Sequence, residues 1–283
     1  MKTAIIGLGL IGGSLAKAIK TRTSHKVYGF DRDRTIQLRA KMVEAIDGIL
    51  TPRQVPQCDL ILLALYPDDI VQWLRENAAR IKPGAIVCDC GGIKSRICQT
   101  GFELARQHGF VFIGGHPMAG IERFGFAAAQ ANLFSRATMV LIPDSDTPLQ
   151  TVAQLKEFFL SLGFSRIKIT AAEEHDRVIA YTSQLAHILS SAYIKSDTAF
   201  SHTGISAGSF RDMTRVATLQ PQMWTQLCME NREALLPELS GLIERLRTYE
   251  AALQAGDHEK MIALFEEGCD YKARVEHSGK KTV

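Results

Sequence analysis

Three glycines near the N-terminus constrain the fold more than any other feature of this chain. An apolar segment at residues 2–6 leads directly into Gly7, Gly9 and Gly12, and a helical pattern follows. At this spacing the first glycine allows a tight turn, the second lets the backbone approach a pyrophosphate, and the third lets the helix pack closely on the strand. The helix N-terminus then faces the anion. The motif predicts a dinucleotide-binding β-α-β unit.

The acidic residue after the second predicted strand bears on the choice of dinucleotide. The strand at residues 26–30 ends at Asp31, about 20 residues after the glycines. A carboxylate there accepts hydrogen bonds from ribose hydroxyls and repels a 2′-phosphate, which favours NAD over NADP. Arg32 and Arg34 weaken this preference, because either guanidinium can turn toward a phosphate. The expected cofactor contacts are Gly7, Gly9, Leu10, Ile11, Gly12, Asp31, Arg32 and Leu65.

Short apolar runs alternate with helical patterns up to residue 170. Strands are predicted at residues 59–65, 85–88, 110–113, 137–142 and 166–170, with helices at 67–80, 94–107 and 148–162. Continuous apolar strands separated by helices indicate a mainly parallel sheet that is covered on both faces. We therefore expect an α/β fold in which residues 1–169 form a Rossmann domain with a doubly wound parallel sheet.

Beyond residue 170 the strand-like runs disappear and helical patterns take over, at residues 172–198, 212–218, 221–255 and 257–277. We expect residues 170–283 to form an all-α domain. An apolar stripe on its helices consists of Leu235, Leu239, Leu242, Leu246 and Leu253. Packing within the chain explains part of this stripe, but its length favours cover by a second copy and hence a homodimer.

Composition argues against several classes of function. The formal net charge is +3, from 33 basic and 30 acidic residues with no dense basic run, so nucleic acid and acidic membranes are not the expected partners. The six cysteines lack the paired spacing of a metal site, and free thiols suit a reducing compartment. No signal peptide or membrane-length apolar run is found. We expect a cytoplasmic protein, without a metal, that binds a small anionic ligand.

One titratable imidazole stands in a glycine-rich segment. His116 lies between Gly114 and Gly120 and follows the strand predicted at residues 110–113. Ligands of open α/β sheets bind at the carboxyl ends of the strands, which places His116 near the nicotinamide end of a dinucleotide. Its unperturbed pKa of about 6.5 lets it take a hydroxyl proton near neutral pH. A structural histidine is the alternative, and we predict a catalytic base.

A second group of candidates lies in the helical part. Arg211 and Arg215 are one helical turn apart, and Asp212 is placed to orient the guanidinium of Arg215. Arginine is the preferred partner of a planar carboxylate, although a surface ion pair explains the pattern equally well. Ser183 and His187 share one helix face at a spacing of four residues. Taken alone, His187 is typical of a buried structural histidine.

Four motifs together resemble the prephenate dehydrogenase family. They are residues 7–14 (GLGLIGGS), 115–122 (GHPMAGIE), 182–187 (TSQLAH) and 210–217 (FRDMTRVA), and they span nearly the whole chain. The resemblance implies NAD-dependent oxidative decarboxylation of prephenate to 4-hydroxyphenylpyruvate, a step of tyrosine biosynthesis. It also implies a dimer with a helical C-terminal domain.

The resemblance assigns a role to individual residues. It implies that His116 deprotonates the hydroxyl on ring atom C4, that Arg215 binds a substrate carboxylate, and that His187 and Ser183 assist. The substrate-binding set expected on this basis is Arg215, His187, Ser183, Gly208, Arg211 and Asp212. Arg215 suits the pyruvyl carboxylate better than the ring carboxylate, because strong pairing would hold the group that has to leave.

Three positions qualify the resemblance. Gly92 stands where many members carry a serine that contacts the ring hydroxyl, so a water or Ser95 replaces that contact, or His116 acts alone. Gln184 stands where the family has a histidine, which lowers the positive potential around the side-chain pocket. Glu122 matches a family position that pairs with a basic group or gates the site.

Two other functions remain open. Arogenate dehydrogenase uses the same ring chemistry on an amino substrate, and no residue named above excludes it. A catalytically silent, dinucleotide-sensing protein is the non-enzyme alternative, and the presence of His116 and Arg215 argues against it. A β-hydroxyacid dehydrogenase fits poorly, because its lysine base is expected early in the first helix after the sheet, and Lys195 lies far along that helix.

Overall fold

A computed structural model describes residues 1–280, with side chains as far as His277. Its sheet contains β1 (Lys2–Ile6), β2 (Lys26–Phe30), β3 (Gly48–Ile49), β4 (Leu60–Leu63), β5 (Ile86–Asp89), β6 (Val111–Pro117), β7 (Thr138–Pro143) and β8 (Arg166–Ile169). The strands are ordered β3-β2-β1-β4-β5-β6-β7-β8, and β6 and β7 form the antiparallel pair in an otherwise parallel sheet. The predicted doubly wound, mainly parallel sheet is confirmed.

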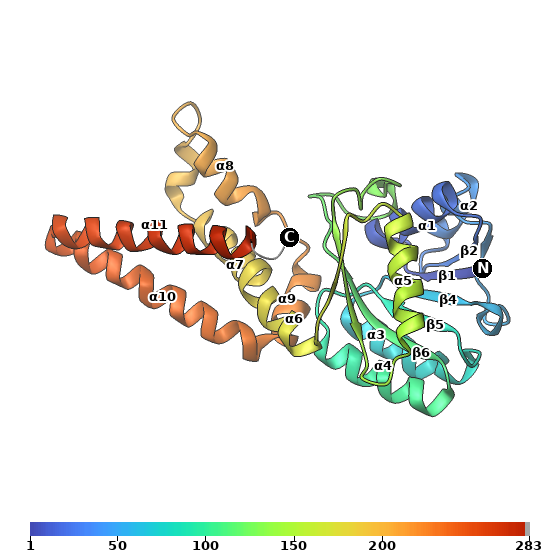
Figure 1. The fold of residues 1–283 in the computed structure, drawn as a ribbon. Helices are drawn as coiled ribbons and strands as arrows, with labels where there is room; N and C mark the ends of the chain where they lie inside the picture. Colours follow the sequence, from blue (N-terminus) through green and yellow to red (C-terminus); the bar gives the residue numbers. More distant parts are fainter. Residues whose placement is uncertain (281–283) are drawn as a thin grey trace. The chain divides into compact units, whose positions relative to one another are not determined.

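Helices cover both faces of this sheet (Figure 1). They are α1 (Leu10–Arg22), α2 (Arg34–Met42), α3 (Pro67–Asn77), α4 (Ser95–His108) and α5 (Leu149–Ser161). One apolar core joins α1 and α5 to the sheet, and a second joins α3 and α4 to its other face. The sequence patterns did not predict α2 or the two-residue strand β3. Short 3-10 turns occur at Val55–Gln57, Ala78–Arg80 and Phe126–Ala128.

Strand β6 continues four residues beyond its predicted end and includes His116. Its antiparallel partner β7 pairs with it from Ile113 to Pro117, so the hydrogen-bonded ladder does not stop at residue 113. The two glycines before His116 allow close neighbours here. A Cβ on Gly114 would overlap the sulfur of Cys98, and a Cβ on Gly115 would overlap the carbonyl oxygen of Asp89.

The helices that follow the sheet begin with one long, locally widened helix. It consists of α6 (Ala172–Ile179), a π-helical segment (Ala180–Leu185) and α7 (Ala186–Tyr193). The chain continues through a 3-10 turn (Asp197–Ser201), α8 (Gly208–Thr214), a second 3-10 turn (Arg215–Ala217) and α9 (Pro221–Glu230). The helix predicted over residues 221–255 is interrupted at Asn231, whose ψ of 20° ends α9.

The chain divides into two compact units, Met1–Arg232 and Glu233–Val283. The second consists of α10, which begins at Arg232 (Arg232–Ala255), and α11 (His258–Lys280). The two helices pack as a hairpin in which the Tyr249 hydroxyl donates to the Leu264 carbonyl at 3.1 Å. Leu246 and Leu253 of the predicted apolar stripe are exposed, whereas Leu235 is buried. None of the helices that the structure describes is long and apolar enough to cross a membrane.

Candidate active site

The glycine loop between β1 and α1 fits a pyrophosphate. Gly7 has a φ of +88°, and a Cβ there would overlap the carbonyl oxygen of Ala64. A Cβ on Gly12 would overlap the carbonyl oxygen of Gly7, whereas at Gly9 no atom lies within 4 Å of the Cβ position. Gly9 caps α1 without a side-chain hydrogen bond, so the first N–H groups of the helix, from Leu10 onward, are open to an anion.

Asp31 is fixed at the end of β2 beside this loop. Its Oδ2 accepts from the Leu8 amide at 2.8 Å, and its Oδ1 accepts from the Asp33 amide at 3.0 Å. Each carboxylate oxygen has a further lone pair, which suits ribose hydroxyls. Leu65, just beyond β4, lies beside Gly7. The loop and Asp31 together fit NAD, which is the cofactor that the sequence predicts.

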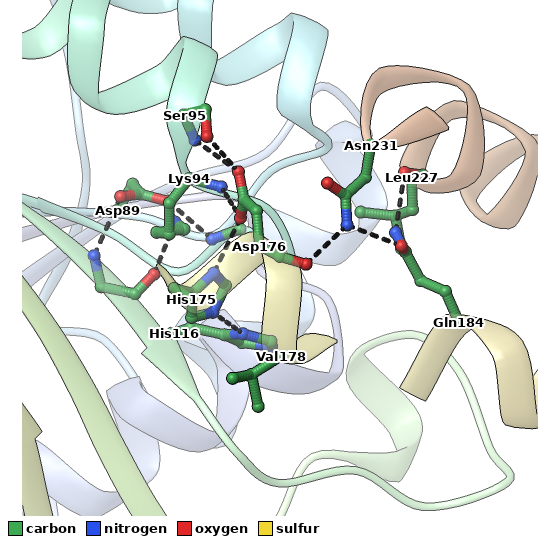
Figure 2. Close-up of polar contacts among 12 residues, drawn as sticks. Asp89, Lys94, Ser95, His116, His175, Asp176, Val178, Gln184, Leu227 and Asn231 are labelled. Carbon is green, nitrogen blue, oxygen red and sulfur yellow. Dashed lines mark hydrogen bonds and ion pairs between the residues drawn. The ribbon is translucent and has the colours of Figure 1, made fainter. Parts of the chain in front are cut away.

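His116 is joined to a second histidine that the sequence did not single out (Figure 2). Its Nδ1 lies 2.9 Å from Nε2 of His175, and the two rings meet edge to face at 67°. His175 belongs to α6 and is buried, while His116 stays partly accessible. The two residues are 59 positions apart in the sequence, so no local sequence pattern predicts their contact.

Asp176 holds the far side of His175. Its Oδ1 lies 2.8 Å from Nδ1 of His175 and accepts from the Lys94 amide at 2.8 Å. Its Oδ2 accepts from the Ser95 amide at 2.8 Å and from the Ser95 hydroxyl at 2.5 Å. Burial opposes ionisation of this carboxyl, but the hydrogen bonds from His175 and Ser95 outweigh it and lower the pKa of Asp176. Asp176 is therefore a carboxylate that only accepts hydrogen bonds.

These contacts fix the protons on both rings. Because Asp176 accepts, Nδ1 of His175 carries hydrogen, and in the neutral ring its Nε2 accepts. The neutral His116 ring then donates from Nδ1 and leaves its own Nε2 unprotonated. Burial, and next the nearby His175 and Lys94, hold the pKa of His116 well below its ordinary value of 6.5. His116 therefore presents a free base at neutral pH.

A buried ion pair fixes the strand segment that carries His116. The side chains of Lys94 and Asp89 are both fully buried and form an ion pair. The Lys94 ammonium also donates to the Gly115 carbonyl at 2.7 Å, and Asp89 accepts from the Gly115 amide at 3.0 Å. Both polar groups of the residue before His116 are thus held by one charge pair.

Arg215 pairs with an acid that lies far from it in sequence. Its guanidinium donates to a Glu122 carboxylate oxygen at 2.6 Å, and both side chains are about half exposed. The prediction that Asp212 orients Arg215 is wrong, because no ion pair joins them in the part of the chain that the structure describes. Helix α8 ends at Thr214 and Arg215 begins a tighter 3-10 turn, which removes the helical spacing on which that prediction depended. Gly208 begins α8, and Arg211 on the same helix is exposed.

His187 has a defined tautomer as well. Its Nδ1 donates to the Ser183 carbonyl at 2.8 Å, and its ring stacks on Trp224 with centroids 3.7 Å apart. Burial, opposed by the Ser183 hydrogen bond and aided by the charge of Arg215, lowers the pKa of His187. The neutral ring presents Nε2 as an acceptor. Ser183 and His187, predicted to share one helix face, are thus joined through the Ser183 backbone carbonyl. Trp224 was not predicted from the sequence.

Ser95 and Gln184, named above where this chain departs from the family, both have partners within the protein. Ser95 donates its hydroxyl to Asp176, so it does not take over a ring-hydroxyl contact at Gly92. Gln184 is 1% exposed, and its amide donates to the Leu227 carbonyl at 2.8 Å and accepts from Asn231 at 2.7 Å. Gln184 is therefore part of the interior, and Figure 2 shows its contacts with Leu227 and Asn231.

The chain matches two family models in succession. Residues 15–168 match the model "Prephenate dehydrogenase, nucleotide-binding domain", and residues 171–267 match "Prephenate dehydrogenase, dimerization domain". A cyclohexadienyl dehydrogenase from Zymomonas mobilis is 34% identical over 281 residues, which are 96% of this chain and 94% of that protein.

Solved structures show the same likeness. Prephenate dehydrogenase from Aquifex aeolicus in complex with hydroxyphenyl propionate and NAD+ has a TM-score of 0.80 and 26% identity, and the match covers 96% of this chain and 98% of that one. Arogenate dehydrogenase from Synechocystis also has a TM-score of 0.80 and 26% identity, and the match covers 97% of this chain and all of that one.

Proposed function

Because the chain belongs to the prephenate dehydrogenase family, we propose that it converts prephenate to 4-hydroxyphenylpyruvate with NAD, a step of tyrosine biosynthesis. The observation that carries this proposal is the 2.9 Å contact between His116 Nδ1 and His175 Nε2, from which an unprotonated Nε2 of His116 follows. A dehydrogenase of this kind needs a base for one hydroxyl proton and a hydride acceptor beside it. The nicotinamide of bound NAD accepts the hydride.

The proton follows a closed path through His116. Nε2 takes the proton of the C4 hydroxyl as hydride leaves C4, and the bond from C1 to its carboxylate carbon breaks. Carbon dioxide departs, and its bonding electrons complete the aromatic ring. The phenolate oxygen then takes the proton back from His116. While the imidazolium exists, the His175–Asp176 pair stabilises its charge from the Nδ1 side.

We assign Arg215 to the pyruvyl carboxylate of the substrate. A guanidinium can donate two parallel hydrogen bonds to a carboxylate, and in this structure one guanidinium nitrogen of Arg215 donates to Glu122 at 2.6 Å. Substrate therefore replaces Glu122 on Arg215. His187 belongs to α7, which packs against the 3-10 turn that Arg215 begins. Ser183, Gly208, Arg211 and Asp212 complete the proposed binding region.

Arogenate is the second candidate substrate, and one observation favours it. Neutral His187 offers an acceptor nitrogen, which suits the ammonium group of arogenate better than the keto oxygen of prephenate. The ring chemistry and the role of His116 are the same for both substrates.

We also propose a homodimer formed through the helices after the sheet, with residues 1–169 as the cofactor domain and 170–283 as the substrate and dimerisation domain. The match of residues 171–267 to a dimerization-domain model supports this. So do the exposed apolar side chains of the second compact unit, among them Leu246, Leu253, Ile262 and Phe265. Light scattering on a sizing column measures the mass directly, and a monomer at micromolar concentration contradicts the proposal.

The test of function is NADH formation by the purified protein with prephenate and with arogenate, each offered NAD and NADP. Turnover of prephenate with NAD is the expected result. Turnover of arogenate alone would move the assignment to the second candidate. NADH binding without turnover of either substrate would contradict both and favour a sensor.

A further inference from the structure

Two arginines, Arg32 and Arg34, follow the acid that is proposed to select the dinucleotide, and only the Arg34 side chain forms a hydrogen bond in the described chain. The Arg34 guanidinium donates to Oε1 of Gln37 at 3.0 Å, whereas no partner of Arg32 occurs among residues 1–280. Both arginines are exposed, and neither forms an ion pair with Asp31 in the described chain. The Arg34 side chain is thus hydrogen-bonded to Gln37 of α2. Arg32 directly follows Asp31 in sequence, and its side chain has no hydrogen bond or ion pair in the described chain.

The side-chain amide of Gln37 bridges Arg34 and the main chain at Asp31, and its orientation is fixed. Its side chain is 6% exposed, and its Nε2 donates to the main-chain carbonyl of Asp31. A carbonyl only accepts and a guanidinium only donates, so the amide of Gln37 can be oriented in one way. Asp33 caps the same helix by accepting from the Thr35 amide at 2.7 Å. The start of α2 is therefore a fixed scaffold against which Arg34 is held.

We propose that Gln37 is a cofactor-selectivity residue. By holding Arg34 against α2, its amide leaves Arg32 as the one cation of this pair that is available to a 2′-phosphate, and Asp31 repels the phosphate. Preference for NAD then rests on two devices, repulsion by Asp31 and restraint of Arg34. The inference depends on the NAD site that the proposed function requires, but not on the identity of the substrate.

Binding of NADH and NADPH to the purified protein without substrate tests this, by protein-fluorescence quenching or calorimetry. Gln37→Leu is expected to tighten NADPH by about five- to tenfold, the effect of one added charge-assisted contact, and to leave NADH unchanged. Gln37→Glu is the matched control. Both variants lose the donor to the Asp31 carbonyl, but the carboxylate introduced by Gln37→Glu keeps Arg34 paired, so NADPH affinity is not expected to rise.

A double-mutant cycle identifies the cation responsible. In Gln37→Leu, Arg34→Ala is expected to abolish the gain in NADPH affinity, whereas in the native background Arg34→Ala has little effect and Arg32→Ala weakens NADPH. These two arginine substitutions are at exposed positions and leave the hydrogen bond from Gln37 to the Asp31 carbonyl in place. The proposal is overturned if Gln37→Leu leaves NADPH affinity unchanged, if its gain persists without Arg34, or if Arg34→Ala alone weakens NADPH as much as Arg32→Ala. If the native protein did not bind NADH at all, the proposed function itself would be contradicted.

Discussion

Nδ1 of His116 lies 2.9 Å from Nε2 of His175, and a carboxylate on the far side of His175 sets which of the two nitrogens carries the proton. The base is therefore prepared by a chain of three residues rather than by His116 alone. Asp176 is itself held by two backbone amides and a hydroxyl from the start of α4. The protonation state of the site is thus built into the contact between α4 and α6.

Removal of the base is the most direct test of this arrangement. His116→Asn is expected to lower kcat/KM for prephenate by about 10² to 10⁴, the range typical of a general base. The NADH dissociation constant is expected to stay the same, because the glycine loop and Asp31 are untouched. A variant that keeps more than a tenth of native turnover would show that another group takes the proton.

Asp176→Asn tests the relay behind the base. Both oxygens of Asp176 face N–H donors, so an amide NH₂ opposes one of them in either orientation, and the tautomer of His175 is no longer fixed. Turnover is expected to fall by about 10². The lost carboxylate also raised the pKa of His116, so the acid limb of the pH–rate profile should move to lower pH.

Ser95→Ala is the matched control, because it removes one hydrogen bond to Asp176 and keeps the carboxylate. Its turnover is expected to stay within about tenfold of the native value. Equal losses in both variants, with no movement of the acid limb, would make Asp176 a purely structural residue.

The lowered pKa values of His116 and His187 predict how stability depends on pH. Both histidines take up a proton near pH 6.5 when unfolded but resist it when folded. The unfolded state therefore holds more protons below pH 6.5, and the free energy of unfolding falls as the pH drops through that value. His116 contributes at most about 1.4 kcal/mol per pH unit. His187 contributes less, because the Ser183 hydrogen bond opposes the lowering of its pKa. Between pH 7.5 and 5, the free energy of unfolding measured with urea should fall less steeply with decreasing pH for His116→Asn than for the native protein. The same dependence on pH in both proteins would refute the prediction.

The elements with local signals could be predicted from the sequence. The glycine motif and Asp31 identify the cofactor loop because each residue acts within one β-α-β unit. The segment around His116 is recognisable for a similar reason, since its glycines are needed where β6 runs against Cys98 and Asp89.

The partners of His116 had no such signal. His175 and Asp176 are adjacent residues at the start of an amphipathic helix, where acidic and basic residues are common, and their contacts cross 59 to 82 residues of chain. Lys94 is a lone lysine that becomes fully buried only because Asp89 is beside it in space. The sequence predicted that Glu122 pairs with a basic group or gates the site, but it did not identify that group as Arg215, because the two residues lie 93 positions apart in the chain.

The buried ion pair of Lys94 and Asp89 is expected to contribute to the free energy of unfolding. Lys94→Met leaves the Asp89 carboxylate buried without a counter-charge, which costs about 3–5 kcal/mol. Urea unfolding measures the loss. The double variant Lys94→Met with Asp89→Asn should recover part of it, because no isolated charge remains. Equal stability of the single and double variants would mean that the charge pair does not hold the segment before His116.

Substitutions of Arg215 and Glu122 are expected to change substrate affinity in opposite directions. Arg215→Ala removes the proposed carboxylate partner and is expected to raise KM for prephenate by about 10- to 100-fold, as for loss of a charge-assisted pair. Glu122→Gln removes the acid that occupies the guanidinium at 2.6 Å and is expected to lower KM by a few-fold, because substrate no longer displaces a charged partner. The two variants are compared with Arg166→Ala, an exposed arginine on β8 that lies outside the proposed binding region and makes no ion pair in the described chain. If Arg215→Ala lowered kcat and left KM untouched, Arg215 would act on the reaction rather than on the pyruvyl carboxylate, and its assignment would fail.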